Sequence, residues 1–161
     1  MTEAAQANPQ PIFNIEKLYV KDMSLEVPNS PQIFLERDTP QIEVQLHSEA
    51  AVVEDGIFDV TVTATVTAKV PEKDKVLFLI EAKQSGIFQA RNIPAPEIET
   101  VLAVVCPNIL YPYLREVVSD MSIRAGFAPV MLNPVNFEAI YLQQKQQSQA
   151  QTPAADEVVK H

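Results

Sequence analysis

The residues of this chain that could perform chemistry are few. One cysteine, Cys106, and two histidines, His47 and His161, supply all the thiol and imidazole groups among 161 residues. Structural zinc needs four ligands drawn mainly from cysteine and histidine, so we predict no bound metal. Cys106 lacks an evident basic partner. A single histidine in an alternating strand, such as His47, is far more typical of a surface position than of a catalyst.

Phosphate-binding loops and nucleophile elbows are missing from the sequence. The glycines Gly56, Gly86 and Gly126 lie too far apart to form a phosphate-cradling loop or a dinucleotide fingerprint. No G-x-S-x-G pattern occurs. Neighbouring acids such as Glu97 and Glu99 are expected by chance where 20% of the residues are charged. We therefore predict no cofactor and no enzymatic activity, which leaves a binding or scaffolding protein.

The charge of the chain restricts its partners. An excess of 21 acidic over 12 basic residues gives a net charge of −9, which repels nucleic acid and attracts a basic partner. The plainer alternative is that the acidity only keeps an oligomer soluble. No apolar run approaches the ~20 residues of a membrane-spanning helix, and residues 1–11 do not resemble a secretory signal. These features predict a cytoplasmic protein without direct membrane insertion.

The first half of the chain has the pattern of a sheet. Apolar residues that alternate with polar ones predict four strands. The strands cover residues 13–27, 42–47, 58–70 and 76–88. On the first strand the pattern places Tyr19 on the apolar face with Phe13 and Leu25, while Gly86 predicts a bulge in the fourth. An acidic turn is expected over residues 48–56, and short connections indicate antiparallel pairing.

The second half has the pattern of helices. One helix begins near Pro96 and ends at Pro107, a second runs from about Asn108 to a stop at Gly126, and a third covers about residues 136–146. The predicted fold is therefore α+β, a four-stranded antiparallel sheet followed by helices packed on one face.

The ends of the chain are polar and have too little apolar surface to fold. The predicted organisation is a disordered N-terminal tail over residues 1–10, a single domain over residues 11–146 and a disordered C-terminal tail over residues 147–161.

Two proline-rich connections carry unusual amounts of apolar surface. Residues 28–40 include Ile33, Phe34 and Leu35, and residues 127–136 are similarly apolar. Such residues either anchor their own loop or offer a contact surface. Together with the β-branched sheet they predict a buried surface between subunits and an exposed apolar groove.

Four segments resemble the SecB family of bacterial protein-export chaperones. The likeness spans about residues 12–144, with the segments in the same order. They are L-Y-V-K-D-M-S-L-E-V-P-N-S-P at residues 18–31, Q-S-G-I-F at 84–88, C-P-N-I-L-Y-P-Y-L-R-E at 106–116 and L-N-P-V-N-F at 132–137.

The resemblance implies an assembly and a function. It implies a homotetramer, a dimer of dimers in which each dimer forms an eight-stranded sheet and the long helices lie between the two sheets. The helix that starts near Asn108 would be the central one. The implied function is to hold newly made precursor proteins unfolded in the cytoplasm, without nucleotide, and to deliver them to the motor ATPase SecA.

The resemblance also implies two binding sites. An acidic patch that receives the basic, zinc-containing tail of SecA would comprise Asp22, Glu26, Leu79 and Glu81, and the zinc would belong to SecA. A groove for unfolded precursors, between the proline-rich connection and the last helix, would comprise Phe34, Tyr111, Phe137 and Tyr141. Extended precursors would add backbone hydrogen bonds there, which makes binding tolerant of sequence.

One departure from the family pattern concerns the groove. Family members often carry a tryptophan in the first connection, where this chain has Thr39, and the chain has no tryptophan. We expect a shallower groove at that point. Two alternatives to a general export chaperone are a SecB-like chaperone dedicated to one client, such as an antitoxin, and a structural oligomerisation module without affinity for unfolded proteins.

Overall fold

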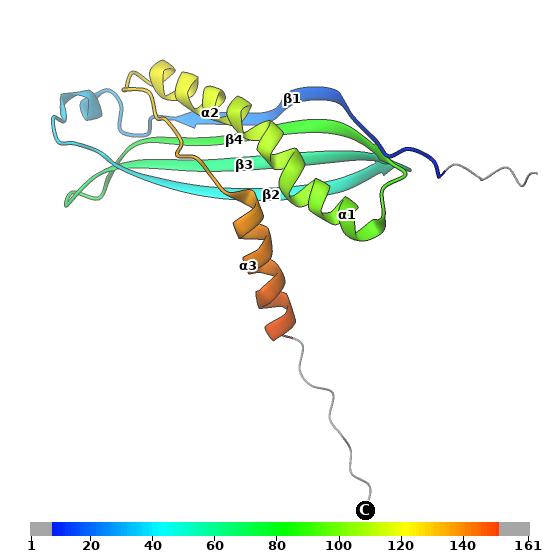
Figure 1. The fold of residues 1–161 in the computed structure, drawn as a ribbon. Coiled ribbons are helices and arrows are strands. Elements are labelled where there is room, and N and C mark those ends of the chain that lie inside the picture. Colours follow the sequence, from blue (N-terminus) through cyan, green and yellow to red (C-terminus); the bar gives the residue numbers. More distant parts are fainter. Residues whose placement is uncertain (1–7, 152–161) are drawn as a thin grey trace, which may run out of the picture.

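The computed structural model describes residues 8–151, so most of each predicted tail lies outside the described residues (Figure 1). It contains one antiparallel sheet in the order β1-β4-β3-β2. The strands are β1 (Ile12–Glu26), β2 (Gln41–Glu54), β3 (Ile57–Val70) and β4 (Lys75–Arg91). A short 3-10 helix, η1 (Gln32–Leu35), lies in the connection between β1 and β2. The predicted α+β fold class is confirmed.

The sheet has one face covered by a helix and one open face. We call them the helix face and the open face. On β3 the alternation predicted from the sequence holds, because the valines and alanines of the helix face are fully buried while most of the threonines on the open face are partly exposed. Helix α2 (Cys106–Arg124) lies diagonally across the helix face (Figure 1). Leu110, Leu114 and Val118 are among its fully buried apolar residues.

The helix over this sheet is longer than predicted, because Pro107 does not end it. Helix α1 (Ala95–Thr100) continues through a π turn, η2 (Val101–Val105), into α2. The amide of Cys106 donates to the carbonyl of Val101, five residues earlier, so the coil is wider than an α-helix just before Pro107. Proline lacks the amide hydrogen and its ring needs room beside the preceding turn. The π turn provides that room.

The continuous helix Ala95–Arg124 is long and apolar enough to cross a membrane by length and composition, with a mean hydropathy of 1.3 over 18 residues. No such segment was expected from the sequence. The core helix of a soluble protein meets the same criteria, and here the helix packs on the sheet. The apolar residues of this helix are accounted for by its packing on the sheet.

The end of α2 matches the prediction at Gly126. This residue has a φ of +92°, and the amide of Phe127 donates to the carbonyl of Ser122, as in a Schellman motif. The buried Ser122 hydroxyl also accepts a hydrogen bond from the amide of Val130 at 2.9 Å. These bonds fix the start of the connection to α3 (Phe137–Ala150), the last helix.

Helix α3 extends away from the sheet in Figure 1. Asn136 caps it, since its side-chain oxygen accepts from the amide of Ala139 at 3.0 Å. The helix continues to Ala150, four residues beyond the predicted domain boundary at residue 146. The remainder of the predicted tail, from residue 152, lies outside the described residues.

Two strand predictions were wrong. Residues 48–54 continue β2 rather than forming a turn, and only Asp55 and Gly56 connect β2 to β3. Gly86 does not mark a bulge, since it pairs in register with Val60 on β3. It is a glycine because a Cβ atom there would lie 2.6 Å from the Phe88 ring and 3.1 Å from the Leu110 side chain. The requirement is close packing of α2 on the sheet.

Candidate binding sites

The four predicted residues of the acidic patch lie together on the open face. In the pairing of β1 with β4, Glu26 lies opposite Leu79 and Ser24 lies opposite Glu81, while Asp22 lies one further pair along, opposite Lys83. The three acidic side chains are exposed and Leu79 is partly exposed. The structure therefore brings the patch together on two adjacent strands.

Two irregularities interrupt the pairing of β1, and they exchange the faces of the residues between them. The pairing with β4 shifts between Ile15 and Lys17 and again between Val20 and Asp22. A shift of one residue exchanges the two faces of a strand. Tyr19 consequently lies on the open face, opposite Ser85, and not on the apolar face as the simple alternation predicted.

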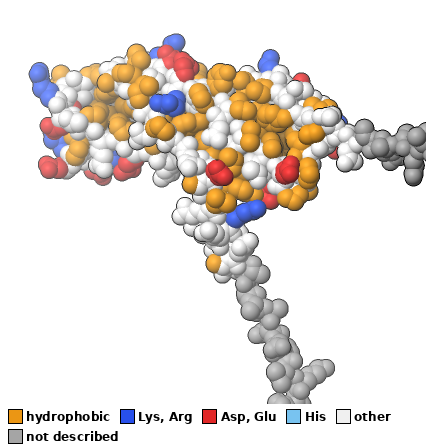
Figure 2. All heavy atoms as spheres, in the orientation of Figure 1, with side chains coloured by type: hydrophobic (Ala, Val, Ile, Leu, Met, Phe, Trp, Pro, Cys, Tyr) orange, Lys and Arg blue, Asp and Glu red, His pale blue; other side chains and the backbone are white. Residues whose placement is uncertain are grey.

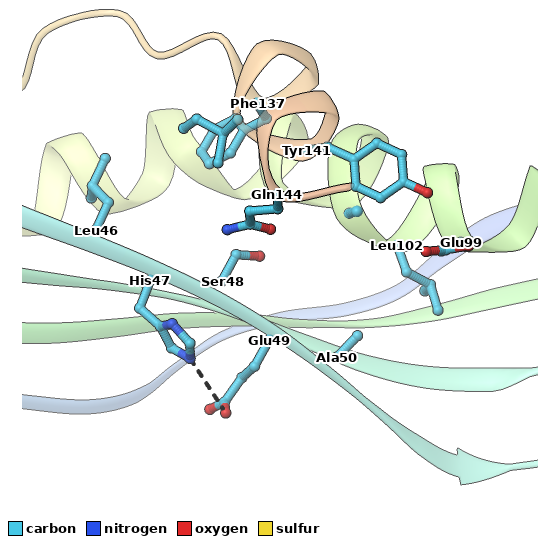
Figure 3. A pocket seen from close by; sticks show the side chains of 12 residues that line it. Leu46, His47, Ser48, Glu49, Ala50, Glu99, Leu102, Phe137, Tyr141 and Gln144 are labelled. Atoms are coloured by element: carbon cyan, nitrogen blue, oxygen red, sulfur yellow. Dashed lines mark ion pairs between the residues drawn. The ribbon is translucent and has the colours of Figure 1, made fainter. Parts of the chain in front are cut away.

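A groove lies between the edge strand β2, the π turn and α3, with a volume of about 350 Å³. Figure 3 shows Leu46, Ser48 and Ala50 on the side of β2 that faces α3, while His47 and Glu49 point away and form an ion pair at 3.9 Å. The apolar wall is completed by residues of the π turn and α3. They are Leu102, Ala103, Phe137, Ile140 and Tyr141.

Three of the four predicted groove residues meet at this site. Phe137 and Tyr141 line the groove directly. Tyr111 packs its ring edge against Phe137, with centroids 5.6 Å apart, and its hydroxyl donates to the carbonyl of Asn133. Tyr111 and Phe137 are only 7% and 5% exposed, so they form the support of the groove more than its surface. Burial raises the pKa of Tyr111, which keeps its hydroxyl a hydrogen-bond donor.

The fourth predicted residue, Phe34, lies apart from these three. It stacks on Phe127 at 5.3 Å, and Phe127 contacts Phe78 at 5.1 Å. The predicted set is thus divided between an aromatic cluster beside η1 and the groove beside α3. The sequence showed that residues 127–136 were apolar, yet Phe127 and Phe78 were not assigned to the site because neither periodicity nor spacing relates a loop to a distant strand.

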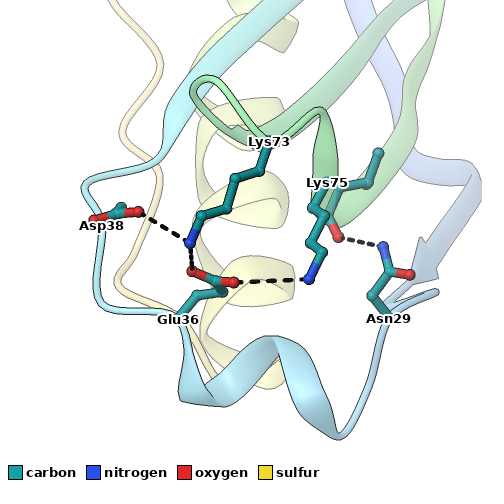
Figure 4. A network of polar contacts seen from close by, with 6 residues as sticks. Asn29, Glu36, Asp38, Lys73 and Lys75 are labelled. Carbon is teal, nitrogen blue, oxygen red and sulfur yellow. Dashed lines mark hydrogen bonds and ion pairs between the residues drawn. The ribbon is translucent and has the colours of Figure 1, made fainter.

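The connection that carries Phe34 is fixed to the turn between β3 and β4 (Figure 4). Lys73 contacts Glu36 at 3.1 Å and Asp38 at 3.6 Å, and Lys75 lies 3.9 Å from Glu36. Asn29 also donates to the carbonyl of Val76 at 3.0 Å. We call these contacts the loop clamp.

Cys106 has no arrangement around it that would make it reactive. It is fully buried, and burial raises the pKa of its thiol to about 12. Within residues 8–151 no group of three or more metal-ligating side chains occurs.

Comparison with known proteins decides the family. A family model described as preprotein translocase subunit SecB matches residues 6–148. The chain belongs to the SecB family. A protein-export protein SecB of Nitrosomonas eutropha is 60% identical over 153 residues, covering 95% of this chain and 94% of the relative. Another, of Aromatoleum aromaticum, is 61% identical and covers 90% of both chains.

A solved structure agrees with the fold. It is a SecB-like chaperone of Mycobacterium tuberculosis in complex with a ChAD peptide from the HigA1 antitoxin. It matches with a TM-score of 0.64 and 15% identity, covering 77% of this chain and 91% of the other. This likeness concerns the fold alone. The SecB relatives of high identity establish the function class, and this chain is a holdase chaperone for preprotein export.

Proposed function

We propose that this SecB chain binds extended segments of unfolded precursors in the groove beside α3, acts as a cytoplasmic homotetramer without ATP or catalysis, and delivers its clients to SecA. The observation that carries the proposal is the open apolar groove beside an edge strand. Strand β2 has a free edge, so an extended client can pair with its backbone while alternate side chains enter the groove. Backbone pairing is independent of sequence, which suits a chaperone with many clients.

The SecA contact is proposed on the open face. Asp22, Glu26 and Glu81 present three carboxylates around the partly exposed Leu79. A basic tail would be attracted by these charges and would cover the leucine. The groove beside α3 lies over the helix face, so one subunit can contact a client and SecA on opposite faces of its sheet.

Assembly into a tetramer is supported by exposed apolar side chains on the helix face. Figure 2 shows extensive apolar surface on this side of the molecule. Exposed members include Val20 and Met23 of β1 and Tyr113 and Ile123 of α2. A surface of this kind on a soluble chain marks a protein contact, and the family's dimer of dimers would cover it.

The SecA assignment is tested by charge reversal. The variant Asp22→Lys with Glu81→Lys should weaken SecA binding at least ~10-fold at low salt, because two attractive charges become repulsive, and the difference should shrink as salt screens them. The matched control is Asp55→Lys with Glu72→Lys, which changes the net charge equally at two turns. Equal SecA affinity of the two variants in titration calorimetry would remove the assignment, provided both retain the assembly of the wild type.

The groove is tested by client capture. Phe137→Ala, combined with Phe34→Ala in the aromatic cluster beside η1, should reduce binding of a reduced, unfolded precursor. Because Phe137 is buried, a second variant, Ile140→Ser, changes a groove residue that is 39% exposed. It should weaken capture without altering the unfolding temperature. Val52→Ala, at an exposed site outside the groove, is the control. Capture by Ile140→Ser equal to that by the control would place the clients elsewhere.

Dedication to a single antitoxin is the less favoured alternative. Relatives named as protein-export proteins are up to 61% identical to this chain, whereas the antitoxin-bound chaperone is 15% identical. A general holdase should bind several unrelated unfolded precursors with similar affinity. A dedicated chaperone would bind one and ignore the others.

A further inference from the structure

A polar cluster on the open face joins β1 to β3 across β4. The Tyr19 hydroxyl donates to Asp59 Oδ1 at 2.9 Å, and Lys21 Nζ donates to Asp59 Oδ2 at 3.2 Å. Since the strand order is β1-β4-β3, both side chains reach over β4. Beneath them, the hydroxyls of Thr61 and Ser85 lie 2.7 Å apart. These two residues are 2% and 0% exposed on a face that is otherwise open.

The cluster is centred on a bulge. Lys21 is the extra residue between Val20, which pairs with Gln84, and Asp22, which pairs with Lys83. An extra residue costs the strand a regular hydrogen-bonded pair and requires other contacts to hold it. Here the bulged residue, Lys21, binds the carboxylate of Asp59. Tyr19, the residue before the bulge on the same face, binds the same carboxylate.

This bulge determines which face Asp22 and Glu26 occupy. If β1 continued regularly from Tyr19, residues 21, 23 and 25 would share the open face with it, and Asp22 and Glu26 would point to the helix face. The extra residue reverses that order, so Asp22 and Glu26 join Leu79 and Glu81. The earlier shift between Ile15 and Lys17 has already exchanged the faces once, so Asp22 and Glu26 stay on the open face only while the shift at Lys21 is also present.

We infer that Asp59, together with Tyr19 and Lys21, is a positioning device for the acidic patch: it locks the bulge at Lys21 and so holds Asp22 and Glu26 on the partner-binding face. Thr63 on β3 is level with Asp22 on β1, and Asp59 lies four residues from Thr63 along β3. Asp59 is therefore displaced from Asp22 by about 13 Å along the strand direction. It acts through the strand rather than by touching the partner. The inference rests on the proposed contact with SecA.

The contacts of Asp59 favour a role in holding β1 over a general contribution to the stability of the sheet. The Asp59 side chain is only 14% exposed and accepts from both partners. The hydrogen bond to Asp59 raises the pKa of Lys21, and burial followed by the bond to Asp59 raises the pKa of Tyr19. Both groups therefore stay protonated as donors near neutral pH. The contacts join one edge strand to the sheet, so their loss should act on β1 first.

The test uses full-length protein with Asp59→Asn and Tyr19→Phe, and with Asp55→Asn as the control that removes the same charge at the β2–β3 turn. Amide hydrogen exchange should become ~10-fold faster in residues 18–26 of both test variants and stay unchanged in β3. SecA affinity should fall about fivefold in both, because the carboxylates are presented in a fixed geometry for part of the time only. Asp55→Asn should change neither quantity.

Three results would overturn the inference. These are unchanged exchange in residues 18–26, exchange that rises equally in every strand, or faster local exchange with undiminished SecA affinity. A failure of the SecA assignment itself is recognised separately, because the Asp22 and Glu81 charge reversal would then leave SecA binding intact while the exchange result in β1 still reports on the bulge.

Discussion

At the scale of single residues, burial decides which groups can react. Cys106 is the only cysteine, and its thiol is fully enclosed in the core under the π turn. The thiolate is the reactive form, and removing it from water is unfavourable. The residue that most resembled a nucleophile in the sequence is therefore a small apolar element of the core.

The thiol leads to a prediction with a defined pH window. The pKa of Cys106 is raised from 9.0 to about 12 on folding, so the unfolded chain loses this proton first as the pH rises. Its contribution to stability is complete below pH 9 and is lost between pH 9 and 12, at up to ~1.4 kcal/mol per pH unit.

The measurement compares wild type with Cys106→Ala by thermal unfolding. We expect wild type to lose more stability than the variant between pH 9 and pH 11. The comparison removes the contributions of tyrosines, which both proteins share. Native protein should also resist iodoacetamide at pH 8. Parallel stability profiles together with rapid alkylation would show that the thiol is accessible.

At the scale of elements, the sequence predicted regular patterns well and their interruptions poorly. Strand β3, with period two over its whole length, was predicted within one residue. Pro107 was expected to end a helix, since proline usually does, but a π turn accommodates it within the continuous helix Ala95–Arg124. Whether a proline ends a helix or lies within it depends on tertiary packing, which cannot be read from the neighbouring residues in the sequence.

Dependence on tertiary packing also explains why the acidic patch and the groove were predicted only in part. Alternation placed Asp22 and Glu26 on the polar face of the first strand, and resemblance proposed the patch as a site, but no local residue type announces the two register shifts of β1 or the position of Tyr19. Gly86 showed the converse: a glycine that local rules assign to a bulge is required by a helix that packs over it. The groove beside α3 was predicted in part, because Phe137 and Tyr141 lie on one helix face, while Phe34 belongs to a separate cluster.

The loop clamp is an element whose role can be measured. Lys73→Ala removes the contacts to Glu36 and Asp38, so amide exchange in residues 32–38 should become ~3-fold faster, and high salt should have the same effect on wild type. Because Lys73 and Asp38 are exposed, the unfolding temperature should hardly change.

Lys69→Ala is the matched control for the clamp. Lys69 contacts Asp74 within the same hairpin at 4.0 Å and has no ion pair with the loop. If the two alanine variants exchange residues 32–38 at the same rate, the ion pairs do not hold the loop. If only Lys73→Ala loosens it, the position of Phe34 depends on the clamp.

At the scale of the whole molecule, the proposed contacts with clients and with SecA lie on the two faces of one sheet. The helix face carries the core, exposed apolar surface and the groove, while the open face carries the proposed acidic patch. Clients and the motor would thus approach from different sides. A holdase needs this separation, because the motor must bind while the client is still held.

The central claim is that the assembled protein holds unfolded precursors without nucleotide. The most direct test is native mass measurement of the purified protein, alone and mixed with a reduced, urea-unfolded precursor diluted into buffer without ATP. We predict a species of four copies of the 17.9 kDa chain that acquires the mass of the precursor at micromolar concentration. A tetramer that remains free of precursor under these conditions would contradict the account.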